Sequence, residues 1–276
     1  MSGPASTSLK AYLVPPPPPN FVRDKLRYFL QQLGISWILT LRTVRALFTP
    51  PFEGRAILAQ MESIGVKSFG IASITAVFIG MVMAVQFAIS MQKFGAMEFT
   101  GRFVGLSFSR ELAPTLTAVI VGGRVGAGMA AEVGSMAVTE QIDAIRALGA
   151  DPVKKLVVPR VVASILVMPI LSMFALVFGF SGAMLVTSSQ FNIAPSFFLQ
   201  TALNSTTLAD FLSGVCKCPW FGGIIALVGC HFGLITTGGT EGVGRSTTRT
   251  VVVISIAILI ADFFLTKVYY FVFGST

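Results

Sequence analysis

Long apolar blocks separated by short polar segments dominate the chain from residue 70 onward. A soluble amphipathic helix shows a polar face, and these blocks mostly do not. A helix needs about 20 apolar residues to cross a bilayer core of about 30 Å. The pattern therefore predicts five membrane-spanning helices. Their apolar blocks cover residues 70–91, 112–131, 156–186, 221–235 and 251–273.

The composition supports the same class. Charged residues make up only 12% of the chain, about half the fraction usual in soluble domains. Strands of a membrane β-barrel alternate apolar and polar residues, whereas these blocks are continuous. The predicted fold is an all-α polytopic membrane protein, in which an amphipathic interfacial helix precedes the spans.

The residues before the first span divide into two segments. Residues 1–20 contain the proline run 15–19 and are predicted to be a disordered tail. Residues 21–64 mix basic and apolar side chains with Trp37, which is typical of a helix lying in the membrane interface. A soluble helix packed on a partner subunit is the alternative. We expect no signal peptide, because the apolar stretch 11–14 is too short. Residues 65–276 form the predicted membrane domain.

The net charge is +8, and its distribution predicts the orientation. Basic residues gather before the first span, between the second and third spans, and between the fourth and fifth. Loops on the other side carry few, which is the positive-inside pattern. We therefore expect a multi-pass protein of the inner (cytoplasmic) membrane, with its N-terminus in the cytoplasm and its C-terminus outside.

The cytoplasmic segment 139–151 predicts a short amphipathic helix. Thr139 is the expected N-cap, and Gly149 followed by Pro152 is the expected stop. This helix either caps the bundle or docks on an ATPase, and the residues alone favour neither. The candidate contact residues are Glu140, Gln141, Ile142, Asp143, Ile145, Arg146, Leu148 and Asp151.

No catalytic constellation is visible in the sequence. It lacks the Gly-rich loop that binds nucleotide phosphates, so we expect no ATPase site in this chain. The single His231 and the three cysteines suggest no metal site. We therefore expect a transport subunit without a cofactor of its own, not an enzyme.

Six ionisable residues stand out because they lie within or at the ends of the predicted spans: Arg110, Glu111, Arg124, Glu132, Lys217 and Asp262. A charge at the bilayer centre costs about 2.5–3.5 kcal/mol on insertion scales. These groups therefore form either an internal ion-pair network or a polar patch along a head-group pathway. Gly122 and Gly126 form a small-xxx-small step, which packs helices closely within one chain or between two copies.

Several motifs occur in a fixed order along the membrane domain. They are Arg-Glu-Leu-Ala-Pro at 110–114, Gly-Arg-Val-Gly at 123–126, Ala-Glu-Val-Gly-Ser-Met at 131–136, Thr-Glu-Gln at 139–141, Gly-Ala-Asp-Pro at 149–152 and Gly-Val-Gly-Arg-Ser-Thr-Thr at 242–248. Together they resemble the MlaE/YrbE permease family over roughly residues 65–270. Ala113 and Ser135 depart from the family pattern, each by a small residue for another small residue.

The resemblance implies a homodimer that binds two cytoplasmic ABC ATPase subunits, which use ATP and Mg²⁺, and an MCE-domain envelope protein. Residues 139–151 would be the coupling helix. Arg110, Glu111, Lys217 and Asp262 would form the polar part of a lipid pocket, and the acyl-chain part would include Phe87, Ala88, Leu106 and Leu112.

The expected function is ATP-driven movement of phospholipid, or a related lipid, between the inner membrane and the outer envelope. Two alternatives belong to other classes. An autonomous proton-coupled secondary transporter would use Glu111 and Asp262 as proton sites. A structural membrane scaffold would need no lipid site.

Overall fold

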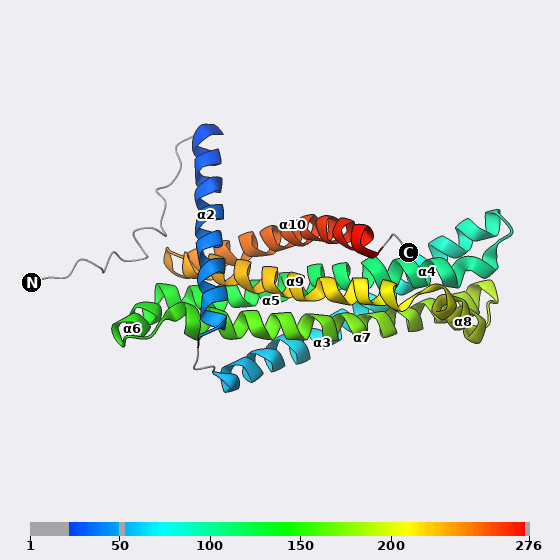
Figure 1. Ribbon diagram of the computed structural model, residues 1–276, viewed down its shortest axis with the longest axis horizontal. Coiled ribbons are helices and arrows are strands. Elements are labelled where there is room, and N and C mark those ends of the chain that lie inside the picture. Colours follow the sequence, from blue (N-terminus) through cyan, green and yellow to red (C-terminus); the bar gives the residue numbers. More distant parts are fainter. Residues whose placement is uncertain (1–21, 50–52, 274–276) are drawn as a thin grey trace, which may run out of the picture.

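The computed structural model describes residues 22–49 and 53–273, which form a bundle of long helices (Figure 1). In this part of the chain, five helical segments are long and apolar enough to cross a bilayer, which confirms the predicted all-α polytopic fold. The first, fourth and fifth are α3 (Gly54–Lys93), α9 (Leu208–Leu234) and α10 (Gly239–Phe273). The second joins η1 (Met97–Phe99), α4 (Thr100–Ser107), η2 (Phe108–Leu112) and α5 (Ala113–Val138). The third joins η3 (Val153–Val157) and α7 (Val158–Phe191).

The spanning helices extend beyond the predicted apolar blocks. The fourth, for example, begins at Leu208 and not near residue 221, and it includes Lys217. Backbone groups inside a membrane must keep their hydrogen bonds, so a charged residue does not end a helix when its side chain finds a partner. The apolar blocks therefore underestimate the length of these helices.

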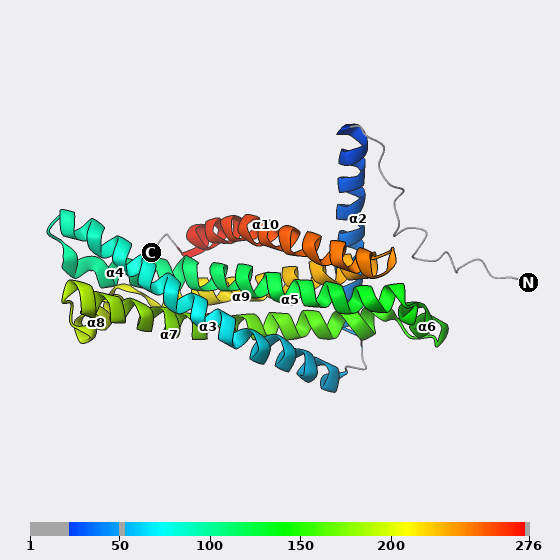
Figure 2. The same cartoon turned by 180° about the vertical axis from the view of Figure 1, so that it is seen from behind.

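The two ends of the bundle carry different short helices. Helix α6 (Gln141–Ala147) lies at one end, whereas α4 and α8 (Pro195–Ser205) lie side by side at the other (Figures 1 and 2). Helix α8 begins at Pro195, a residue suited to the first turn of a helix. The C-terminal end of α10 lies toward the α4–α8 end. The length of the bundle separates α6 from α4 and α8.

Small residues bring α3 and α7 into direct backbone contact. A Cβ atom at Gly80 would meet the carbonyl group of Gly179, and one at Gly182 would meet the carbonyl group of Val77. Such close approach is how helices associate in a membrane, where the hydrophobic effect does not drive them together. Helix α3 accordingly packs mainly against α7.

The predicted glycine step of α5 also packs within this chain. A Cβ atom at Gly122 would lie 2.9 Å from Cδ1 of Ile225 on α9. A Cβ atom at Gly126 would collide with Cδ1 of Ile254 on α10. Gly122 and Gly126 therefore seat α5 against α9 and α10, in the centre of the apolar core.

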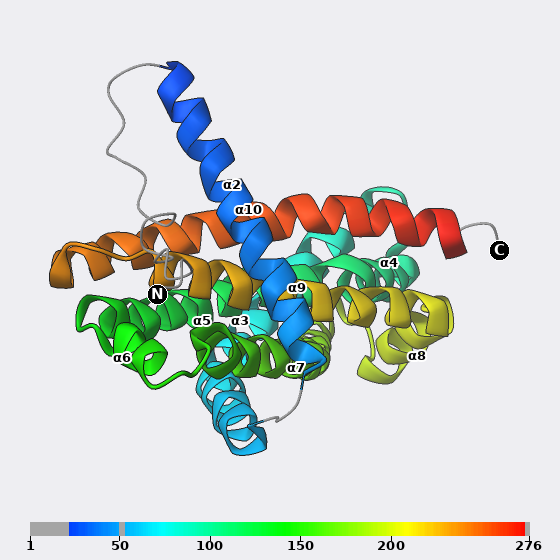
Figure 3. The ribbon, with the colours of Figure 1, turned by 60° about the vertical axis from the view of Figure 1, so that its left-hand side comes forward.

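Helix α2 (Val22–Leu47) runs across the bundle, over α9 and α7 (Figure 3). It is fixed by Gln32, whose Oε1 accepts a hydrogen bond from Nε2 of the buried His231 at 2.9 Å. Its exposed residues include apolar side chains, among them Trp37 at 66% exposed, and the basic Arg42 and Arg45, a mixture typical of a helix in the membrane interface. The predicted interfacial segment 21–64 is divided, because residues 54–64 are the start of α3. The predicted tail 1–20 lies outside the described residues.

Candidate functional site

The second span contains a π-helical turn, η2, and this turn carries Arg110 and Glu111. A π-turn is rare inside a helix and is frequent at functional sites. Two glycines hold it in place: Gly179 accommodates the ring of the buried Phe108, and Gly214 of α9 lies against the carbonyl group of Ser109. The close approach at Gly214 brings the next turn of α9, with Lys217, next to η2.

The Lys217 ammonium group is the centre of a polar cluster between η2, α9 and α10. Its Nζ lies 2.8 Å from Oε2 of Glu111 and 3.2 Å from Oδ1 of Asp262. It also donates to Oγ1 of Thr266 at 2.7 Å and lies 3.3 Å from the carbonyl oxygen of Arg110. Thr266 in turn donates to Oε1 of Glu111 at 3.1 Å. Of the residues predicted to form one polar group, Glu111, Lys217 and Asp262 meet in this cluster, whereas the Arg110 side chain lies outside it.

The cluster combines one cation with two carboxylates. Lys217 is buried, whereas the side chains of Glu111 and Asp262 are 39% and 18% exposed. Desolvating an ammonium group costs several kcal/mol unless good ion pairs and hydrogen bonds offset it. Lys217 therefore fixes the register of three helical segments, and the carboxylate of Glu111 is the charged group of the cluster that reaches the surface most.

The Arg110 side chain points to a different partner. Its Nε donates to Oδ1 of Asp210 at 2.6 Å, and its side chain is 54% exposed. Asp210 is buried, and its Oδ2 accepts hydrogen bonds from the backbone N–H and the hydroxyl group of Thr207, both at 2.8 Å. This capping box at the start of α9 holds the carboxylate that orients Arg110.

Thr266 and Asp210 also belong to the site, although no sequence pattern predicted them there. Asp210 stands three residues after Thr207, a spacing typical of a capping box, so this signal was present. Thr266 stands four residues after Asp262, which places both on one face of a helix. Neither spacing reveals that Thr266 interacts with Lys217 or that Asp210 interacts with Arg110.

The four residues expected along acyl chains lie in different surroundings. Ala88 is fully buried. Phe87 is half-buried and stacks on Phe103, with 5.9 Å between ring centroids. Leu106 is half-buried on α4, and Leu112 lines a cavity of about 10 Å³ between α3, α5 and α7. This cavity has room for about one water molecule, which is too little for an acyl chain.

Helix α6 occupies the position of the predicted coupling helix, but its start differs. Glu140 is the N-cap, with a left-handed φ of 62°. The hydroxyl group of Thr139 donates to the carbonyl of Ser135 and so belongs to the end of α5, which makes the predicted N-cap wrong. Gly149 has a φ of +78°, as predicted for the residue that ends this segment.

The apolar residues of α6 divide between the bundle and the surface. Ile142 is buried and Ile145 half-buried, so they attach α6 to the bundle. Leu148 is 86% exposed at the tip. Asp143 pairs with Arg146 at 2.9 Å, and Oδ1 of Asp151 accepts a hydrogen bond from the backbone N–H of Val153 at 3.0 Å.

Comparisons with known proteins agree with this architecture. A family model described as Permease MlaE matches residues 57–268. A probable ABC transporter permease protein of Synechocystis sp. is 43% identical over 243 residues, which cover 88% of this chain and 92% of that protein. The chloroplastic protein TRIGALACTOSYLDIACYLGLYCEROL 1 of Arabidopsis thaliana is 38% identical, over 88% of this chain and 69% of that protein. A probable ABC transporter permease protein of Rickettsia typhi is 38% identical, over 90% and 96%.

Proposed function

This chain belongs to the MlaE permease family, and we propose on this premise that it moves phospholipid or a related lipid between the inner membrane and the outer envelope. Membership in an ABC permease family implies a partner ATPase. In this proposal the partner binds and hydrolyses ATP with Mg²⁺, and this chain supplies the lipid path. A relative named after a galactosylated diacylglycerol supports a lipid as the substrate.

The observation that carries the proposal is the polar cluster around Lys217, inside a membrane span. Next to it, the half-exposed guanidinium group of Arg110 is oriented by a buried carboxylate, that of Asp210. A planar guanidinium group binds phosphate oxygens well, and Asp210 engages only part of its donors. We assign the phosphate of a lipid head group to Arg110, and any amine or hydroxyl group of that head group to the exposed side of Glu111.

A homodimer is supported by a polar stripe on α5. Arg124, Gly128, Glu132 and Ser135 are exposed at helical spacing within this span. Arg124 donates to Ser68 of α3 at 2.7 Å, and Glu132, 58% exposed, pairs with Arg160 of α7 at 2.9 Å. Facing such groups toward lipid tails is costly. A second copy packed along α5 would cover these polar groups. The covered surface would lie between α3 and α10, and α10 is only weakly buried within one chain.

We assign the two protein partners to opposite ends of the bundle. The ATPase binds α6 on the cytoplasmic side, where Leu148 projects. An MCE-domain protein binds the opposite end, near α4 and α8. The N-terminus is then cytoplasmic and the C-terminus lies outside. ATP-driven closure of the ATPases moves α6 and changes the affinity of the pocket for lipid, since a motor acts only through a difference between states.

The deciding experiment is mass spectrometry of the lipids and proteins that co-purify with the full chain in mild detergent. We expect phospholipid, an ATPase subunit and an MCE-domain protein. The variant Arg110→Gln should lose most of the bound lipid while keeping the ATPase, and Arg102→Gln, an exposed arginine on α4, should behave as the parent chain. Lipid transport by the chain without any ATPase, driven by a proton gradient, would instead support a secondary transporter.

A further inference from the structure

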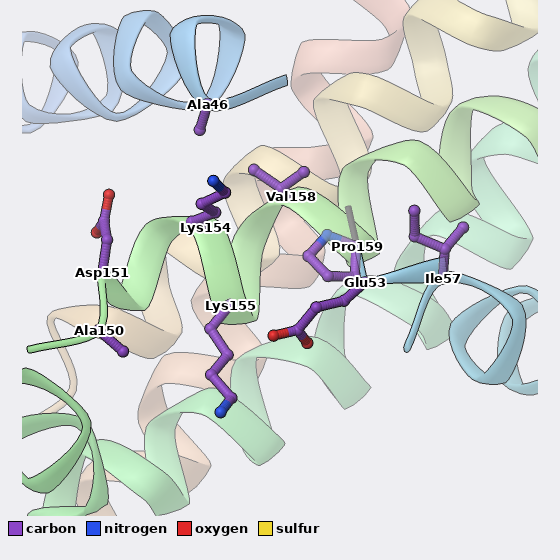
Figure 4. A pocket seen from close by; sticks show the side chains of 9 residues that line it. All are labelled: Ala46, Glu53, Ile57, Ala150, Asp151, Lys154, Lys155, Val158 and Pro159. Carbon is purple, nitrogen blue, oxygen red and sulfur yellow. The ribbon is translucent and has the colours of Figure 1, made fainter. Parts of the chain in front are cut away.

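A pocket with charged and apolar residues lies at the α6 end of the bundle, far from the Lys217 cluster. Figure 4 shows it between the end of α2, the start of α3 and the segment that leads from α6 into α7. Its volume is about 210 Å³. The residues that line it are Ala46, Glu53, Ile57, Ala150, Asp151, Lys154, Lys155, Val158 and Pro159.

The charged groups of this pocket balance each other. Lys154 and Lys155 supply two ammonium groups, and Glu53 and Asp151 supply two carboxylates. The lysines diverge: Lys154 points toward α2, whereas Lys155 points away from it, on the side that the Glu53 carboxylate faces (Figure 4). A simple anion would meet two attractive and two repulsive groups here. A ligand with both a phosphate and an amine would meet a partner for each charge.

Exposed apolar residues lie close in the sequence to the apolar residues of the pocket. Ala46, Ile57 and Val158 contribute apolar side chains to the pocket. Close to them in the sequence, Phe48 at the end of α2 and Leu58 on α3 are 82% and 66% exposed. Helix α2 lies across the bundle and exposes both apolar residues and the basic Arg42 and Arg45 near its end, a mixture typical of a helix at the level of the lipid head groups. A head group in the pocket would leave its acyl chains on this apolar surface.

We propose that this pocket binds the head group of a zwitterionic phospholipid from the leaflet on the α6 side. The phosphate lies against a lysine ammonium group, and the amine lies against Glu53 or Asp151. The bound lipid links the end of α2 to the segment between α6 and α7. The site is separate from the transport pathway and does not depend on the lipid that the Lys217 cluster accepts.

The test uses the full chain in lipid nanodiscs that contain a photoactivatable phosphatidylethanolamine with its reactive group near the head group. Labelled peptides are then mapped by mass spectrometry. We expect adducts on the peptides that contain residues 53–57 and 150–159, and weaker labelling there by a matched phosphatidylglycerol. The double variant Lys154→Gln, Lys155→Gln should lower these adducts about tenfold, the effect of losing a charge-assisted hydrogen bond.

Three controls make the test specific. Lys93→Gln, an exposed lysine at the other end of α3, should label as the parent chain does. Ile57→Trp fills the pocket without changing its charge and should also abolish the adducts. Arg110→Gln should leave them unchanged, which separates this site from the proposed transport pathway.

Four outcomes would overturn the proposal. Equal labelling by the two lipids would remove the case for a zwitterionic ligand. Unchanged labelling in both the lysine and the Ile57 variants would show that the adducts arise outside the pocket. Displacement by free phosphorylethanolamine would assign the pocket to a soluble ligand. Loss of labelling when the ATPase binds would make the pocket part of a protein interface.

Discussion

Lys217 on α9 directs its ammonium group at Glu111 on η2, with 2.8 Å between Nζ and Oε2, although the two residues are 106 positions apart. The same ammonium group reaches Asp262 on α10. One buried cation therefore connects the second, fourth and fifth spans. These three spans lie far apart in the sequence. The cluster therefore forms only when the second, fourth and fifth spans have packed against one another.

Replacing Lys217 with methionine should destabilise the protein strongly. The change leaves Glu111 and Asp262 facing each other without the cation, and removing one partner of a buried ion pair typically costs about 3–5 kcal/mol. The readout is the midpoint of thermal unfolding in detergent, followed by size-exclusion chromatography. The triple variant Lys217→Met, Glu111→Gln, Asp262→Asn should recover much of the loss, because it removes the unpaired charges as well. A single variant as stable as the parent chain would show that the cluster does not hold the spans together.

Gly214→Ala should also lower the unfolding midpoint. The new methyl group would collide with the carbonyl group of Ser109 and push α9 away from η2. Overpacking of this kind costs about 1–3 kcal/mol. Gly70→Ala is the matched control, since its Cβ atom meets nothing within 4 Å and it also lies inside a long helix. If both variants unfold at the same temperature, the close approach at Gly214 does not position Lys217.

Leu148→Asp should abolish binding of the ATPase without affecting the fold. Leu148 is 86% exposed, so a charged side chain costs the isolated chain little, while an apolar contact with the ATPase would be lost. Co-purification with the ATPase measures the effect. Leu208→Asp changes an exposed leucine at the other end of the bundle and should keep the ATPase. Retention of the ATPase by Leu148→Asp would remove this residue from the interface.

Cysteine cross-linking should detect the second copy along α5. In a Cys216→Ser background, which removes the exposed native thiol, Gly128→Cys should give dimers with a short thiol-specific cross-linker. Gly128 lies within the exposed polar stripe of α5. In a dimer packed along this stripe, the two Gly128 residues of the two copies would lie close together. Trp220→Cys, exposed on α9, should stay monomeric on a denaturing gel. Dimers from Trp220→Cys alone would place the interface elsewhere.

Several features follow from local pattern alone. The five apolar blocks determine the five spans, because only a helix satisfies its own backbone inside a bilayer. Gly149 with Pro152 determines where the α6 segment ends, because a positive φ and a missing N–H interrupt a helix. The run of basic and apolar residues around Trp37 similarly determines the amphipathic helix α2.

Other features depend on contacts between distant segments. The helix ends at Met97 and Leu208 extend past the apolar blocks because Arg110 and Lys217 find partners that no local pattern identifies. Thr139 has the residue type of an N-cap, yet its hydroxyl group bonds to Ser135 because α5 continues to Val138. The spacing of Gly122 and Gly126 suits packing within one chain as well as packing between two copies. Ile225 and Ile254 lie against these glycines, so the structure shows packing within the chain.

The sequence by itself therefore determined that this protein has five helices able to span a membrane and which charged residues lie within them, since apolar length is a local property. Only the tertiary structure decided how those charges pair, placing Glu111 and Asp262 at Lys217 and Asp210 at Arg110. It also created the pocket between α2, α3 and the segment after α6. The physical reason is that pairing and cavities depend on the distances between helices, which close packing at Gly214, Gly179 and Gly80 sets across the bundle.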